Sequence, residues 1–237
     1  PRSALPDHPW LETRKLAVMI NILWDLDGTV IDSMAVIARC LTQTSEHFDR
    51  GPVPTGQIRS MIGPELGVSL GRILDTQDAE QIQRAKAFYR SCYQHHLHDS
   101  PVYPGMLEVL QHCNRIGVRQ FIATAKYQLY AEQIIAHSGL AEFFTGIYGS
   151  TESGQYGDKK ELLAWLLAEE KLKASETLMI GDTAYDVAAG RHHDLTSLGV
   201  LWGYSDAPTL LAAGAHQCVA APEDLMAVIK GSTMAFC

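Results

Sequence analysis

The stretch Ile22-Leu23-Trp24-Asp25-Leu26-Asp27-Gly28-Thr29-Val30 contains an apolar run, two acids two positions apart and a glycine. Side chains alternate along a strand, so Asp25 and Asp27 face one side of it and Leu26 faces the other. A strand that ends here directs both acids into the crevice at the carboxyl edge of an open α/β sheet. Carboxylates this close repel each other unless a cation lies between them, and Mg²⁺ prefers such oxygen ligands. The pattern predicts a cation site beside a nucleophile, although Asp and Gly also form ordinary polar turns.

A second apolar run followed by acids lies far downstream. Residues 177–181 lead into Asp182, and Asp186 follows four positions later. The carboxyl ends of parallel strands meet at one edge of a sheet. We therefore expect Asp182 to complete a carboxylate cluster with Asp25.

Two further segments supply groups that suit a phosphate. The apolar run at residues 119–124 ends in Thr124, whose hydroxyl can donate to a phosphate oxygen. Lys159 and Lys160 stand where a helical run begins. Only one of these two lysines is expected to face the site, because successive side chains point in different directions on a regular backbone.

The order of these motifs resembles the haloacid dehalogenase (HAD) superfamily of phosphohydrolases. The resemblance runs from about residue 20 to the C-terminus and rests on Asp25-Leu26-Asp27-Gly28-Thr29, Thr124, a lysine near 159, and Gly181-Asp182-Thr183-Ala184-Tyr185-Asp186. The sequence is also similar to the phosphoglycolate phosphatase-like branch in the segments Ile62-Gly63-Pro64, Tyr103-Pro104-Gly105-Met106 and Gly146-Ile147-Tyr148-Gly149-Ser150. The resemblance implies an α/β fold with a Rossmann-like (HAD-like) parallel-sheet core and a smaller inserted α-helical cap domain.

The resemblance implies a Mg²⁺-dependent phosphomonoester hydrolase that acts on a small phosphorylated metabolite through an aspartyl-phosphate intermediate. Asp25 would attack phosphorus, and Asp27 would protonate the leaving oxygen and then activate water. The implied metal ligands are Asp25, the backbone carbonyl of Asp27 and Asp182, with Asp186 orienting a metal-bound water or the lysine. The implied phosphate-binding residues are Thr124, Ala125 and Lys159. Lys159 is preferred to Lys160 because Lys159-Lys160-Glu161-Leu162 resembles the Lys-x-Glu-Leu pattern of the branch.

Arg59, near the Gly63-Pro64 turn, is a candidate contact for the leaving group of the substrate. A guanidinium pairs well with anionic groups, so this position suits substrate specificity. The alternative is that Arg59 is an ordinary exposed helix residue, since lone charged side chains are mostly solvated.

Apolar strands alternate with amphipathic helices, which favours a parallel sheet with right-handed crossovers. We expect strands near residues 20–25, 119–124, 145–149, 177–181 and 197–202. Residues 34–101 show helical periodicity without a strand pattern, most clearly at residues 78–98. The resembling family inserts its cap directly after the first motif and starts shortly before the first strand. Together with this pattern, the resemblance implies a core domain at residues 19–33 and 102–237, a cap domain at residues 34–101 and an N-terminal extension at residues 1–18, with Met19 as a candidate natural start.

Composition argues against several classes of partner. The chain is 46% hydrophobic and 19% charged, as expected of a globular protein. Its net charge of −8 argues against a general nucleic-acid partner. None of the five cysteines forms a Cys-x-x-Cys pair, and no apolar run reaches the roughly 18 residues that cross a bilayer. We predict a cytoplasmic protein without membrane or nucleic-acid partners, and the sequence does not indicate its oligomeric state.

Two other functions fit the same motifs. A phosphomutase of the same superfamily would form the aspartyl phosphate and return the phosphoryl group to a sugar. A non-catalytic phosphate-ligand sensor would bind a ligand on the same fold without turnover. Isomerised product would identify the mutase, and tight binding without turnover across many substrates would identify the sensor.

Overall fold

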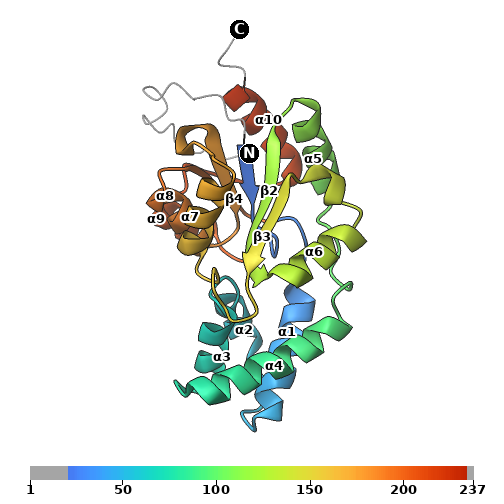
Figure 1. Ribbon diagram of the computed structural model, residues 1–237, viewed down its shortest axis with the longest axis vertical. Helices are drawn as coiled ribbons and strands as arrows, with labels where there is room; N and C mark the ends of the chain where they lie inside the picture. Colours follow the sequence, from blue (N-terminus) through green and yellow to red (C-terminus); the bar gives the residue numbers. More distant parts are fainter. Residues whose placement is uncertain (1–20, 234–237) are drawn as a thin grey trace, which may run out of the picture.

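Six parallel strands form one sheet in a computed structural model that describes residues 21–233 of the chain (Figure 1). The strand order is β3-β2-β1-β4-β5-β6. The strands are β1 Asn21–Trp24, β2 Arg119–Tyr127, β3 Gly146–Ser150, β4 Thr177–Gly181, β5 Thr196–Val200 and β6 Gln217–Val219. This order reverses direction at β1, which makes the carboxyl ends of β1 and its neighbours the expected position of a site. The predicted extension at residues 1–18 and Met19 lie outside the described residues.

Helices connect the strands. They are α1 Met34–His47, α2 Thr55–Ile58, α3 Leu66–Leu74, α4 Ala79–His95, α5 Met106–Arg115, α6 Gln128–His137, α7 Lys159–Glu169, α8 Ala184–His192, α9 Ala207–Ala213 and α10 Pro222–Thr233. Short 3₁₀ helices in the described part of the chain are η2 Arg59–Met61, η3 Ala141–Phe143 and η4 Ala174–Glu176. Within residues 21–233, none of the helices combines the length and the apolar character needed to cross a bilayer.

The buried strand β1 supplies side chains to both faces of the sheet. Ile22 and Trp24 belong to one apolar cluster with Leu110 of α5. Leu23 belongs to a second cluster with Leu162 of α7. Alternation along the strand explains this division, and Figure 1 shows α7 and α8 on one side of the sheet and α5 and α10 on the other. The α/β fold class predicted from the sequence is confirmed.

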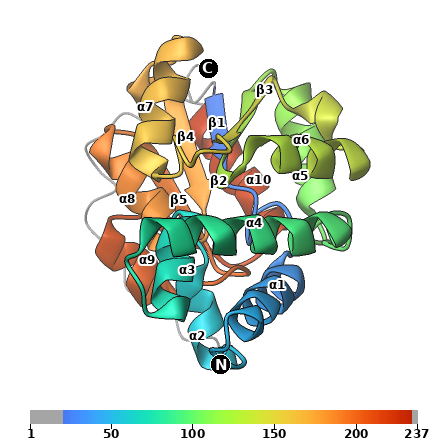
Figure 2. The same cartoon turned by 60° about the horizontal axis from the view of Figure 1, so that its bottom comes forward.

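The helices α1 to α4 lie beyond the carboxyl ends of the strands. Helix α4 packs against α1 and α3, and Figure 2 shows it lying across this end of the sheet. Residues 34–101 contain helices and no strand, as predicted, and the helix expected at residues 78–98 is found at Ala79–His95. The division into a core domain and a cap domain stays a prediction.

The five predicted strands are all present, but two features of the sheet were not predicted. The short strand β6 adds a sixth member at one edge. Strand β2 continues to Tyr127, and its pairing with β3 shifts register between Ala123 and Tyr127. This irregularity lies where Thr124 to Lys126 pass the end of β1, so it changes how these side chains are presented to the site.

Candidate active site

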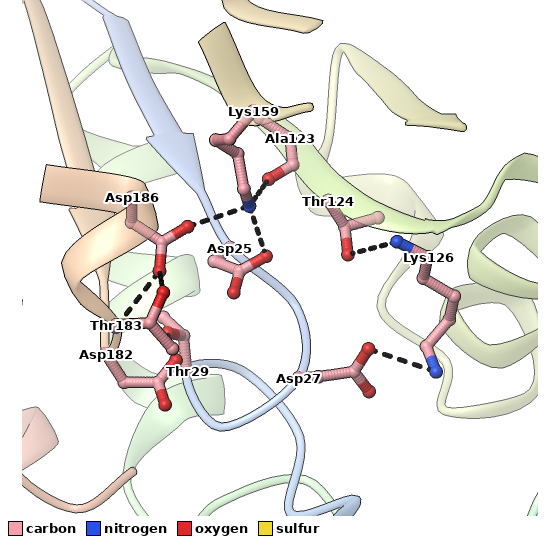
Figure 3. A network of polar contacts seen from close by, with 10 residues as sticks. All are labelled: Asp25, Asp27, Thr29, Ala123, Thr124, Lys126, Lys159, Asp182, Thr183 and Asp186. Atoms are coloured by element: carbon pink, nitrogen blue, oxygen red, sulfur yellow. Dashed lines mark hydrogen bonds and ion pairs between the residues drawn. The ribbon is translucent and has the colours of Figure 1, made fainter. Parts of the chain in front are cut away.

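Asp25 follows directly on β1 and is held against a buried lysine. Its backbone N–H donates to the carbonyl of Ile180, which fixes it beside β4. The Nζ atom of Lys159 lies 2.7 Å from Asp25 Oδ1 and 2.8 Å from Asp186 Oδ1, and it donates to the carbonyl of Ala123 at 2.7 Å (Figure 3). Both Asp25 and Lys159 are buried. The lysine therefore bridges two acids that come from different elements, Asp25 directly after β1 and Asp186 in α8.

Burial and neighbouring charge set the ionisation of this pair. The pKa of Asp25 is raised to about 7, because burial and the neighbouring carboxylate of Asp186 raise it more than Lys159 lowers it. Burial alone would lower the pKa of Lys159, but the carboxylates of Asp186 and Asp25 hold it above its ordinary value. The ammonium therefore stays charged, while Asp25 can gain or lose a proton near neutral pH.

Asp182, at the end of β4, is fully buried and directed by two hydrogen bonds. Thr29 Oγ1 donates to its Oδ1 at 3.0 Å, and the Tyr204 backbone N–H donates to its Oδ2 at 2.9 Å. Burial raises the pKa of Asp182, and Asp25 and Asp186 raise it further. Three carboxylates crowded together in this way form a strong candidate site for a divalent cation.

Asp25, Asp182 and Asp186 each place one carboxylate oxygen within 4.8 Å of the others. These oxygen ligands suit a hard cation such as Mg²⁺. Asp186 also has a structural use, because its Oδ2 accepts hydrogen bonds from the backbone N–H and the hydroxyl of Thr183 at the start of α8. Its other oxygen meets Lys159, which agrees with a role in orienting the lysine.

Gly28 allows the chain to turn closely over this cluster. Its φ of +84° is in the left-handed region, and a Cβ atom at this position would overlap the carboxylate of Asp182. Only glycine meets both conditions without strain.

Asp27 points away from the carboxylate cluster toward a second lysine. Lys126 Nζ lies 3.0 Å from Asp27 Oδ2 (Figure 3). It also donates to the hydroxyl of Tyr93 on α4 at 2.7 Å. Asp27 Oδ1 is buried and has no hydrogen-bond partner within residues 21–233. The backbone N–H of Lys126 donates to Thr124 Oγ1 at 3.2 Å. Lys126 was not among the residues predicted for the site, although its position two residues after Thr124 could have indicated a role.

A cavity of about 100 Å³ joins these groups to the helices beyond the sheet. Six of the residues predicted for the site border it, namely Asp25, Asp27, Thr124, Ala125, Lys159 and Asp186. Of the two adjacent lysines, Lys159 faces the cavity and Lys160 is exposed. Arg59 is exposed and does not border the cavity, so its role in specificity stays a prediction. Arg90 of α4, which was not predicted from the sequence, does border it.

Comparisons with known proteins agree with this geometry. The family model described as haloacid dehalogenase-like hydrolase matches residues 22–200. The chain is 26% identical to a phosphoglycolate phosphatase of Vibrio parahaemolyticus over 219 residues, which cover 89% of this chain and 96% of that protein. It is 29% identical to the tyrosine-protein kinase PtkA of Mycobacterium tuberculosis over 188 residues, or 78% of this chain and 63% of that protein.

A solved structure is also similar along nearly its whole length. The crystal structure of a predicted phosphatase from Clostridium acetobutylicum superposes with a TM-score of 0.86 at 28% identity. The superposition covers 91% of this chain and 100% of that one.

Proposed function

The chain belongs to the haloacid dehalogenase-like hydrolase family and is an enzyme of the phosphatase type, and we propose that it hydrolyses phosphomonoesters of small metabolites through a covalent intermediate on Asp25. The observation that carries this proposal is the meeting of Asp25 with the ammonium of Lys159 beside two further buried carboxylates. A nucleophile, a cation site and a charge that neutralises phosphate oxygens would then all reach one phosphoryl group.

In the proposed reaction, a carboxylate oxygen of Asp25 attacks phosphorus, the ester P–O bond breaks, and Asp27 gives a proton to the leaving oxygen. Asp27 then takes a proton from water, whose oxygen attacks the phosphorus on Asp25, so that phosphate leaves and the carboxylate is restored. Asp27 suits this role because Lys126 holds one of its oxygens while the other has no partner among the described residues. Thr124, Ala125 and Lys159 would bind the remaining phosphate oxygens.

Asp25, Asp182 and the backbone carbonyl of Asp27 are the proposed ligands of Mg²⁺, with Asp186 beside them. The donor set fits this cation, because it consists of oxygens and its buried carboxylates need a compensating positive charge. When bound, Mg²⁺ would neutralise phosphate oxygens as a Lewis acid.

We propose that residues 34–101 act as a cap that excludes bulk water from the phosphorylated Asp25. Two contacts of α4 with the sheet side of the molecule support this role. Tyr93 accepts a hydrogen bond from Lys126, and Arg90 Nη2 donates to the carbonyl of Glu152 at 2.8 Å. Helix α4 is therefore tied to the end of β2, which carries Thr124 and Ala125, and to the loop that leads into α7, where Lys159 lies.

Phosphate release from a panel of phosphorylated metabolites, with Mg²⁺ and with EDTA, tests the proposal. Release should require Mg²⁺ and fall at least about 10³-fold in Asp25→Asn, because an amide is a far weaker nucleophile than a carboxylate. Asp27→Asn should also be slow, since it cannot donate or accept the proton. Asp49→Asn is the matched control, because Asp49 is exposed at the end of α1 and Asn tolerates its positive φ. Activity of Asp25→Asn near the unmodified rate would reject the proposal.

The same assay separates other outcomes. One relative is named a tyrosine-protein kinase, so ATP with a tyrosine-containing peptide belongs in the panel. Product analysis of sugar phosphates detects a mutase, which would return an isomer in place of free phosphate. If the proposal is correct, the enzyme releases phosphate from small monoesters. It then neither phosphorylates the peptide nor converts one sugar phosphate into its isomer.

A further inference from the structure

Arg90 is a cation at the cavity, and no carboxylate of residues 21–233 lies within ion-pair distance of it. The other two cationic side chains that border the cavity each meet an acid, Lys159 with Asp25 and Lys126 with Asp27. Within residues 21–233, no acid lies within 4.0 Å of the Arg90 guanidinium. A cation kept without a counter-ion in a partly buried cleft is suited to an anion that arrives with a ligand.

The guanidinium is held in place without being neutralised. Its Cζ atom lies 5.1 Å from the centre of the Tyr127 ring, and one N–H bond goes to the carbonyl of Glu152. The hydroxyl of Tyr130 donates to the backbone carbonyl of Arg90 at 3.0 Å. The Nε atom is buried and has no hydrogen-bond partner among the described residues. The side chain is therefore oriented in advance, and a buried donor is left for a ligand to satisfy.

Arg90 borders the part of the cavity where the leaving group of the substrate would lie. The proposed phosphate end is at Thr124 and Lys159, at the carboxyl edge of the sheet, whereas Arg90 comes from α4, which lies across that edge (Figure 2). Helix α4 brings Tyr89, Arg90 and Tyr93 to the cavity at spacings of one helical face. The cavity is only about 100 Å³, which favours a compact leaving group.

We propose that Arg90 determines substrate specificity by pairing with a second anionic group, a carboxylate or a phosphate, on the leaving group of a small phosphomonoester. This inference rests on the proposed phosphatase function. A planar guanidinium matches either anion with two parallel hydrogen bonds, and an uncharged leaving group would leave the buried Nε donor unsatisfied. Arg90 then selects the substrate, while Asp25 and Asp27 carry out the chemistry.

A purely structural role predicts a different result. If Arg90 serves only to tie α4 to the carbonyl of Glu152, its loss slows the reaction of every substrate by the same factor. If it also pairs with the leaving group, its loss slows substrates that carry the second anion more than their uncharged counterparts. The ratio of kcat/KM between a charged substrate and its uncharged isostere separates these two roles.

The experiment measures kcat and KM for 2-phosphoglycolate against its amide, and for propane-1,3-diol bisphosphate against propyl phosphate. The unmodified enzyme should prefer the anionic member of at least one pair by roughly 10- to 100-fold, the range expected for a hydrogen bond to a charged group. Arg90→Gln should bring the ratio of kcat/KM between the charged and the uncharged member close to 1, whatever common loss both members share, and Arg90→Lys should keep part of the preference. The pair that responds identifies the anion.

Arg84→Gln is the control, because Arg84 is exposed on the same helix and does not border the cavity. Equal losses for charged and uncharged substrates in Arg90→Gln would overturn the inference, as would an unmodified enzyme without any preference for the anion. The preference of the unmodified enzyme is measured without any variant, so that test remains available even if Arg90→Gln fails to fold. Failure of the proposed function looks different, because no compound in either pair would then release phosphate.

Discussion

Replacing Lys159 by Met should strongly destabilise the metal-free protein. Lys159 is 5% exposed, and its ammonium contacts Asp25, Asp186 and the carbonyl of Ala123 at 2.7 to 2.8 Å. Met keeps a similar length of side chain but leaves both carboxylates without their cation. Removing one partner of a buried ion pair costs about 3–5 kcal/mol. We expect a loss of this size in the free energy of unfolding at pH 8, measured by urea titration with circular dichroism in EDTA.

The pH dependence of this loss follows from the pKa of Asp25, which burial raises to about 7 even with the lysine present. Lys159 lowers that pKa, so its removal raises it further. When the pKa of a carboxyl group is higher in the folded than in the unfolded state, the free energy of unfolding falls with rising pH between the two pKa values and is constant above the higher one. In the unmodified protein, the contribution of Asp25 to the free energy of unfolding stops falling above about pH 7. In the variant it continues to fall above pH 7, at up to about 1.4 kcal/mol per pH unit.

The deficit of Lys159→Met should therefore be larger at pH 8 than at pH 6 by roughly 1 kcal/mol. Lys160→Met is the control, since Lys160 is the exposed neighbour and its substitution should change stability by less than about 0.5 kcal/mol. A deficit below about 1 kcal/mol at pH 8 would show that the bridge between the two acids contributes little. A deficit larger at pH 6 than at pH 8 would refute the assignment of the effect to Asp25.

Two further predictions concern the cation site. Binding of Mg²⁺ near pH 7 should release protons, and binding should weaken at lower pH, because the pKa of Asp25 is about 7 and its carboxyl group must ionise to bind the cation. Isothermal titration calorimetry in buffers of different ionisation enthalpy measures this release. Binding heats that are the same in all buffers would contradict the prediction. Gly28→Ala should lower the free energy of unfolding by more than the roughly 1–2 kcal/mol cost of a left-handed backbone, because its Cβ would also overlap Asp182. Gly51→Ala measures the backbone cost alone, because Gly51 has a φ of +72° and nothing lies within 4 Å of an added Cβ. Equal losses of stability in the two variants would show that the contact with Asp182 adds no cost.

The sequence predicted the position of the acids well because that position is a local property. An apolar strand followed by an acid places the acid at a sheet edge, and Asp25 and Asp182 both follow this rule. The preference for Lys159 over Lys160 agrees with the burial of the former. The strand β6 was missed because its three residues, Gln217–Val219, are too few to show a period. Its place in the sheet depends on pairing with β5, which no local pattern specifies.

The cap-side residues of the cavity could not be predicted, because they depend on how distant helices dock. Arg59 was singled out for its position beside the Gly63-Pro64 turn, yet it is exposed, whereas Arg90 borders the cavity from a different helix. The apolar periodicity of residues 78–98 indicated a helix, but periodicity does not show which polar residue beside the apolar face meets the core. Tyr93 and Lys126 contact each other across 33 positions of sequence, a pairing that only the docked structure reveals.

The charges around the cavity support the proposal that a divalent cation binds before an anionic substrate. Four carboxylates and three cations gather there, namely Asp25, Asp27, Asp182 and Asp186 with Lys126, Lys159 and Arg90. With all of them ionised the site carries one net negative charge, which repels a phosphate. A divalent cation reverses that sign, and the screening length of about 8 Å in physiological salt prevents the overall charge of −8 from dominating. Attraction of the substrate is therefore a property of a few local groups, and Arg90 is the one among them whose charge no carboxylate of the described chain offsets.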